Sequence, residues 1–269
     1  AAAPLQRGAP EPAPRATNRQ PNRSGGVLIV EYHRIARQEA RWDRSIQAFR
    51  RDLERLHRLG FRPVTLSEYL ENRMDLPPGA SPVVFTFDDS HPSQLRFLDD
   101  GKLAPDCALG VWSAFAAKHP DFPVRATFFV LPPTPWGQPG RVAAKFRLLR
   151  ELGCEVGSHT YSHANLGRLP VEAAERELRR SSDWIAREFG VRPSAIALPY
   201  GVAPKDPGLL KRCGFRAALL VGAGPAPSPD EPKRNPFRLP RIQAIDGEYG
   251  LSYWLDRIEA GKVRPYVAP

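Results

Sequence analysis

Short apolar runs alternate with helix-like segments along most of the chain. Several runs contain almost no polar residue, which is typical of strands buried on both faces of a parallel sheet. Between them, apolar residues recur every three or four positions, which predicts helices. The predicted strands are Val27–Tyr32, Arg62–Thr65, Val83–Asp88, Ala126–Leu131, Glu155–Ser158, Ala195–Leu198, Ala217–Val221 and Leu239–Ala244. The predicted helices are Ile46–Leu59, Leu66–Arg73, Leu109–Lys118, Arg141–Leu152, Val171–Phe189, Pro207–Cys213 and Tyr249–Ile258.

This alternation predicts an α/β fold in which a barrel of parallel strands is ringed by helices. The 269 residues suit a single domain of this kind, and we expect it to span residues 27–269. Residues 1–26 contain five prolines and no periodic apolar pattern, so we expect a disordered leader there. Functional residues of such barrels follow the carboxyl ends of the strands.

The formal net charge is +10, of which the leader contributes +3. A basic surface attracts anionic partners such as nucleic acids, acidic glycans or cell-wall polymers, and the charge alone does not choose among them. No run of five or six basic residues is interleaved with exposed aromatic residues. We therefore expect no nucleic-acid partner.

Other bulk features concern location and cysteine chemistry. No apolar stretch approaches the roughly 20 residues needed to cross a bilayer, so no membrane span is expected. The start Ala1-Ala2-Ala3 resembles a chain trimmed after a small-residue cleavage site, which favours a secreted or cell-envelope location. Three cysteines (Cys107, Cys154 and Cys213) permit one disulfide with a free thiol, but three buried thiols are favoured.

Two motifs at predicted strand ends carry the candidate chemistry. Asp88 and Asp89 end one strand, and because successive strand residues point to opposite sides, one can bind a metal while its neighbour faces the substrate. Taken alone, such a pair more often caps a helix or makes a turn. His159 and His163 stand four residues apart after another strand; in a helical turn their rings share one face and can bind one ion, although two unrelated exposed histidines are equally compatible.

The combination changes that balance, because both motifs fall at strand ends of one predicted barrel. Two imidazoles and a carboxylate leave coordination positions open, as catalytic metal sites require. A divalent ion lowers the pKa of bound water and polarises a carbonyl, while a neighbouring carboxylate removes the proton. This is the chemistry of amide or ester hydrolysis.

With these motifs, the chain from about Val27 to Ile242 resembles the polysaccharide deacetylases, the family 4 carbohydrate esterases with a NodB-homology domain. Further markers are Glu31–Ile35, Phe49–Leu56 and Gly60–Leu66, which resemble the first strand and helix of exported members acting on amino-sugar polymers. The resemblance implies an irregular (β/α)7 barrel.

The resemblance also implies roles for individual residues. Asp88 would be the general base, and the metal ligands would be Asp89, His159 and His163. The ion would be Zn²⁺, with Co²⁺, Ni²⁺, Mn²⁺ or Fe²⁺ as alternatives. The backbone N–H of Tyr200, in Leu198–Gly201, would stabilise the oxyanion.

Three departures from the family pattern point to a divergent subgroup. Ala197 stands where the family has an arginine that orients the base; Arg241, a charge within an apolar strand, is our candidate replacement, with a surface arginine as the alternative. The family's late general-acid histidine is absent, since His163 is the last histidine, and His33 or His91 could replace it unless each is structural. Ser90 occupies the usual glycine position.

We therefore expect a monomeric metal-dependent hydrolase that removes N-acetyl groups from a carbohydrate polymer of the chitin, peptidoglycan or exopolysaccharide type, with an anionic polymer among the candidates. One alternative is an O-acetyl esterase or a non-sugar amide hydrolase using the same site. The other is a catalytically silent glycan-binding domain. The presence of both base and ligands argues against the silent domain.

Overall fold

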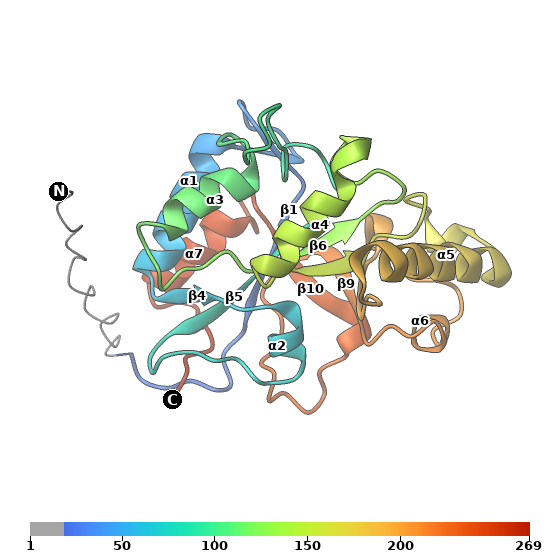
Figure 1. Cartoon of the computed structure of the whole chain (residues 1–269). Helices are drawn as coiled ribbons and strands as arrows, with labels where there is room; N and C mark the ends of the chain where they lie inside the picture. Colours follow the sequence, from blue (N-terminus) through green and yellow to red (C-terminus); the bar gives the residue numbers. More distant parts are fainter. Residues whose placement is uncertain (1–18) are drawn as a thin grey trace, which may run out of the picture.

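The computed structural model describes residues 19–269, and its centre is a closed barrel of seven parallel strands (Figure 1). The strand order around the ring is β1, β10, β9, β8, β7, β6 and β5, and pairing of β1 with β5 closes it. This confirms the predicted irregular (β/α)7 barrel. The strands are β1 (Leu28–Tyr32), β5 (Ser81–Phe87), β6 (Ala126–Val130), β7 (Glu155–Ser158), β8 (Ala195–Ala197), β9 (Ala217–Ala223) and β10 (Leu239–Gln243).

Three short strands lie outside the ring. The predicted strand at Arg62–Thr65 is β4 (Phe61–Pro63), which pairs only with the first residues of β5. A two-stranded ribbon of β2 (Arg34–Ala36) and β3 (Asp43–Ser45) follows β1 and was not predicted. Each ribbon strand has only three residues of mixed exposure, which is too short for an alternating pattern to stand out.

The helices surround the barrel, with α1 beside α3 and α4 beside α5 (Figure 1). Local signals set several ends: Ser45 caps α1, a capping box of Thr65 and Glu68 starts α2, and Gly190 ends α5 in the left-handed conformation. Among residues 19–269, no helix is long and apolar enough to span a membrane. The helices are α1 (Ile46–Arg58), α2 (Leu66–Leu70), α3 (Ala108–Ala116), α4 (Val142–Glu151), α5 (Val171–Phe189), α6 (Leu209–Arg212) and α7 (Leu251–Glu259).

The core is built from the apolar strands and the inward faces of the helices. Every residue of β1, β5 and β6 is buried, as the nearly unbroken apolar runs predict. The three cysteines are free and buried, which confirms the expectation of buried thiols.

The first described residues pack against the end of the chain. Asn22 exchanges two backbone hydrogen bonds with Val267, at 3.0 and 2.9 Å, and Gly26 bridges to Pro265. Residues 19–26, assigned to the disordered leader from sequence, are therefore bonded to the folded body. The remainder of the expected leader, residues 1–18, lies outside the described residues.

Candidate active site

A cavity of about 560 Å³ opens where the carboxyl ends of β5, β7 and β8 meet the loop after β1. This is the end of the barrel at which polar residues were expected to gather. Seven of the eight candidate residues line the cavity, and the exception, Arg241, is fully buried and bonded to Asp88. The wall consists of His33, Arg34, Arg41, Trp42, Asp88, Asp89, His91, His159, His163, Tyr200 and Val221.

Asp89, His159 and His163 come together as one group of candidate ligands. The Nε2 atoms of His159 and His163 lie 3.2 and 3.5 Å from Oδ1 of Asp89. Ligands held 2.0–2.1 Å from one tetrahedral ion would be separated by about 3.3 Å. The donor set and its spacing therefore fit a divalent metal ion.

The two histidines do not lie on a helix, so that expectation from their spacing is wrong. They occupy a loop after β7 in which Thr160 and His163 adopt φ values of 66° and 58°. The left-handed residues turn the chain so that both rings meet, with centroids 4.8 Å apart. A loop with this geometry places the rings together as well as a helical turn would.

The outer ring nitrogens of both histidines have partners that set their orientation. Nδ1 of His159 lies 2.8 Å from the carbonyl oxygen of Ala197, so it donates there and leaves Nε2 free to bind metal. Nδ1 of His163 lies 3.2 Å from the Tyr200 hydroxyl. That role of the Tyr200 side chain was not expected from sequence.

The surroundings of the three candidate ligands shift the pKa of each of them. Burial alone would lower the pKa of His159, but the carboxylates of Asp88 and Asp89 outweigh it and raise that pKa. Burial and the neighbouring His159 lower the pKa of His163. Burial would raise the pKa of Asp89, yet its contacts with His159 lower it, so Asp89 is available as an anion.

Asp88 is bound by Arg241 through two parallel hydrogen bonds. Nη1 and Nη2 of Arg241 donate to Oδ1 and Oδ2 of Asp88 at 2.9 and 2.7 Å. Both side chains are buried, with 0 and 1% exposed. Burial would raise the pKa of Asp88, but Arg241 and His159 hold it well below its usual range. Arg241, the candidate replacement for the arginine absent at Ala197, thus reaches Asp88 from β10.

The turn after β5 has an uncommon backbone conformation. Asp89 and Ser90 adopt φ values of 70° and 50°, an uncommon conformation outside glycine. The Ser90 hydroxyl accepts a hydrogen bond from the backbone N–H of Leu131 at 2.8 Å, and its carbonyl accepts one from Trp136. These two bonds stabilise Ser90 in a left-handed conformation that glycine would adopt with less strain.

The remaining predicted residues also line the cavity. The His33 ring packs against Trp42 with centroids 4.6 Å apart, and Nδ1 of His91 pairs with the Ser93 hydroxyl at 2.8 Å. Tyr200 lies in a tight turn with φ 60°, and the residue is 63% exposed. The structure therefore places every candidate except Arg241 on the wall of one pocket, and Arg241 is bonded to Asp88 of that wall.

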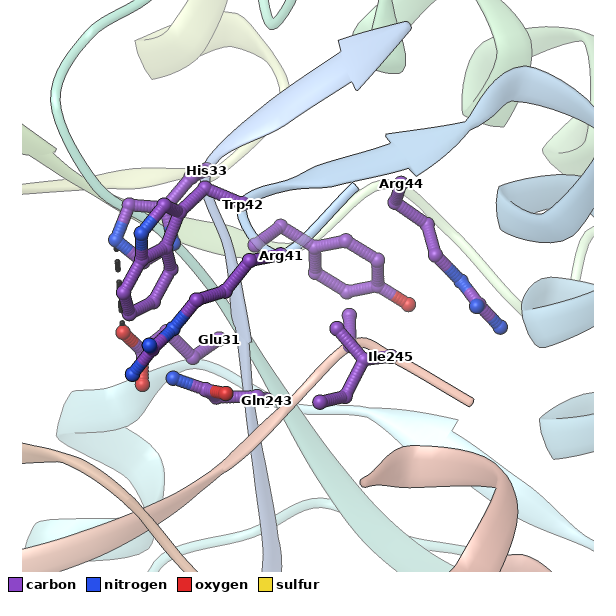
Figure 2. A pocket seen from close by; sticks show the side chains of 9 residues that line it. Glu31, His33, Arg41, Trp42, Arg44, Gln243 and Ile245 are labelled. Atoms are coloured by element: carbon purple, nitrogen blue, oxygen red, sulfur yellow. Dashed lines mark ion pairs between the residues drawn. The ribbon is translucent and has the colours of Figure 1, made fainter. Parts of the chain in front are cut away.

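Three residues of this region were not singled out from sequence: Glu31, Arg41 and Trp42. Figure 2 shows them grouped around His33 at the side of the pocket. Glu31 carried a detectable signal, because it is a charge within the apolar run of β1. Arg41 and Trp42 precede β3 in a polar segment that carries no such signal.

A second cluster, His57, His119 and Asp121, lies between α1 and the segment after α3. The Asp121 carboxylate is bound both by Nε2 of His57, at 3.0 Å from each oxygen, and by the guanidinium of Arg62. Its charge is already balanced, so this cluster is an ion-pair network linking the helices.

Comparisons with known proteins show which family the chain resembles. A family model described as polysaccharide deacetylase matches residues 75–218. The chain is 40% identical over 76 residues to the peptidoglycan-N-acetylmuramic acid deacetylase PdaC of Bacillus subtilis, covering 28% of this chain and 15% of that protein. It is 32% identical over 82 residues to a peptidoglycan-N-acetylglucosamine deacetylase of Bacillus cereus, covering 29% and 27%.

The similarity of fold extends further than that of sequence. The structure of the Streptococcus pyogenes deacetylase PplD in complex with acetate superposes with a TM-score of 0.66 at 17% identity, covering 87% of this chain and 98% of that one. The chain spans well under a third of the curated relatives that it matches, but the family model covers more than half of the chain. The chain therefore belongs to the polysaccharide deacetylase family.

Proposed function

We propose that the protein is a metal-dependent hydrolase that removes N-acetyl groups from an amino-sugar polymer of the cell envelope. The observation that carries this proposal is the placement of Asp88, held by Arg241, beside the three candidate ligands in one open pocket. Two relatives are peptidoglycan deacetylases, which favours peptidoglycan over chitin or an exopolysaccharide. Such a substrate implies a secreted or cell-envelope location.

Asp89, His159 and His163 would hold the ion, and nitrogen ligands with one carboxylate favour Zn²⁺. When bound, a divalent ion polarises the acetyl carbonyl and makes water more acidic. The bond from Ala197 to His159 supports this role, because it fixes the imidazole with Nε2 directed at Asp89.

Asp88 would act as the base. Arg241 and His159 lower its pKa, so at neutral pH the carboxylate is ionised and carries no proton of its own when water attacks the acetyl carbon. The two bonds from Arg241 fix the direction of its carboxylate. The backbone N–H of Tyr200 would donate to the oxygen that becomes negative.

The leaving nitrogen needs a proton, and His33 is our candidate for the acid. His33 lines the same cavity as Asp88 and the three candidate ligands, and 13% of its side chain is exposed. As the C–N bond breaks, the proton of His33 passes to the amine, and acetate is the second product. His91, which also lines the cavity, is the alternative donor.

Acetate release tests the assignment. We expect metal-loaded protein to release acetate from N-acetylglucosamine oligomers or peptidoglycan, and Asp88→Asn to lower turnover by roughly 10²–10⁴-fold. Asp183→Asn, on the exposed face of α5, is the matched control and should retain activity. Acetate from acetylxylan alone would instead assign an O-acetyl esterase. No acetate from either substrate, with metal bound stoichiometrically, would refute a deacetylase.

Elemental analysis tests the ligand set separately. We expect His159→Ala to lose the ion, because one of three ligands and the most buried ring disappear. His119→Ala, outside the pocket, should retain it. Full retention of the ion by His159→Ala would rule out the proposed ligands.

A further inference from the structure

Glu31 is a buried carboxylate beside the candidate site that the mechanism above does not use. It is the fourth of the five residues of β1, and its side chain has no exposed surface. Its Oε2 accepts a hydrogen bond from the backbone N–H of Gly222 at 3.1 Å. A charge in such a place is strongly unfavourable unless other groups compensate it, so its surroundings should show what it does.

The second oxygen, Oε1, lies between two basic groups. It is 3.4 Å from Nη2 of Arg241 and 3.6 Å from Nε2 of His33, and the dashed line in Figure 2 marks the second contact. Among residues 19–269, no group makes a hydrogen bond to this buried oxygen. A shift of a few tenths of an ångström would bring the imidazole N–H into hydrogen-bonding distance.

Arg241 does not by itself account for Glu31. Its Nη atoms are bonded to Asp88 and Thr86, and its Nε donates to the carbonyl of Leu220 at 2.7 Å. One guanidinium thus faces two carboxylates, so Arg241, Asp88 and Glu31 together carry a net charge of −1 when all three are ionised. A proton held between Glu31 and His33 makes the group neutral. Burial, opposed by Arg241, raises the pKa of Glu31, which also favours such a proton.

The His33 ring also has an aromatic neighbour. Trp42 packs on it, and Arg41 lies over the Trp42 ring at 5.1 Å. The space beside Glu31 and His33 is a cavity of only about 10 Å³, room for one water molecule at most. The imidazole is therefore held between an aromatic face and the carboxylate, with Nε2 directed at Glu31 (Figure 2).

We propose that Glu31 is a positioning residue for the deacetylation reaction, which accepts the Nε2–H of His33 and leaves Nδ1–H to protonate the departing amine. This inference rests on the proposed function, with His33 as the acid. When the C–N bond breaks, the Nδ1 proton moves to the amine nitrogen. His33 is then neutral and keeps its Nε2–H on Glu31.

A comparison of leaving groups tests this role. An amine leaves only after protonation, whereas the nitrophenolate of 4-nitrophenyl acetate leaves without it. We expect Glu31→Gln to lower kcat on N-acetylglucosamine oligomers by about 10–100-fold, with KM little changed, and to lower aryl ester hydrolysis by less than about threefold. If Glu31 acted only through Arg241 and Asp88, both substrates would lose activity equally, which would overturn the proposal.

A double-mutant cycle gives a second readout. If Glu31 works through His33, adding Glu31→Gln to His33→Ala should lower amide turnover by no more than about twofold further. If the double variant instead lost the product of the two single-variant losses, the proposal would be overturned. Glu31→Asp keeps the charge but withdraws it from His33, so it should show the same selective loss of amide turnover even if the glutamine variant folds poorly.

Asp52→Asn is the matched control, since Asp52 is another buried carboxylate, bonded to Arg44 and to the Tyr32 hydroxyl, and it lines neither the large cavity nor the small cavity beside Glu31. It should leave the ratio of amide to ester turnover unchanged. A wild-type protein that releases no acetate refutes the proposed function and this inference with it. An active wild type with equal losses on both substrates refutes the inference alone.

Discussion

Replacement of Arg241 by methionine is expected to destabilise the protein strongly at neutral pH. The substitution removes a guanidinium with no exposed surface and leaves the carboxylates of Asp88 and Glu31 buried without their shared partner. Removal of one partner from a buried ion pair typically destabilises by about 3–5 kcal/mol. At about 2–4 °C per kcal/mol for a domain of this size, Tm should fall by about 6–20 °C.

The deficit should depend on pH, and its sign follows from Asp88. In the wild type the folded pKa of Asp88 is lowered, so the ionised carboxylate contributes stability above its unfolded pKa, and this is lost as pH falls through the folded value. Without Arg241, burial raises the pKa of Asp88. The variant is then helped by protonation, so its deficit relative to wild type should shrink as pH falls from 7 toward about 4.

Thermal or urea unfolding of the metal-free proteins at several pH values measures this difference. Arg192→Met is the control, because Arg192 and Asp183 form an ion pair with both side chains more than half exposed, and it should leave stability nearly unchanged. An Arg241→Met variant within about 1 kcal/mol of wild type at pH 7, or a deficit independent of pH, would contradict the reasoning.

Three further outcomes are expected. Tyr200→Phe removes the hydroxyl beside Nδ1 of His163 and should weaken metal affinity by about tenfold in chelator competition; unchanged affinity would exclude a role for the hydroxyl. Burial lowers the pKa of Lys145 to about 8, so wild-type stability should rise relative to Lys145→Met between pH 8 and the unfolded lysine pKa of about 10.4. If the stabilities of the two proteins changed with pH in parallel, this expectation would be wrong. The three cysteines should react with a thiol reagent only after unfolding, and rapid labelling of the native protein would contradict their burial.

The barrel strands were predictable because burial on both faces leaves an unbroken apolar run. The predicted and observed bounds of β1, β5 and β7 differ by no more than two residues at either end. The ribbon of β2 and β3 was not predictable, since it is stabilised by contacts with residues distant in sequence, such as the bond from Ile35 to the Ser93 hydroxyl. Short exposed strands depend on such partners more than on their own pattern.

The site residues were predictable wherever a polar side chain interrupts or ends an apolar run. Arg241 was found in this way, and Glu31 carries the same signal in β1. The spacing of His159 and His163 predicted that they share an ion, but not the loop that presents them. That loop depends on the left-handed conformation of Thr160, which is not predictable from sequence because threonine rarely adopts it.

Closure of the barrel joins residues that are far apart in the chain. Glu31 of β1 lies opposite Gln243 of β10 and Thr86 of β5. The group formed by Glu31, Asp88 and Arg241 therefore needs β1 to be paired with both β10 and β5. Such long-range pairings form late and slowly during folding, because they close large loops. Until then, these charged side chains remain hydrated in the open sheet. Catalytic competence should therefore appear only in the final kinetic phase of refolding, after most helices have formed.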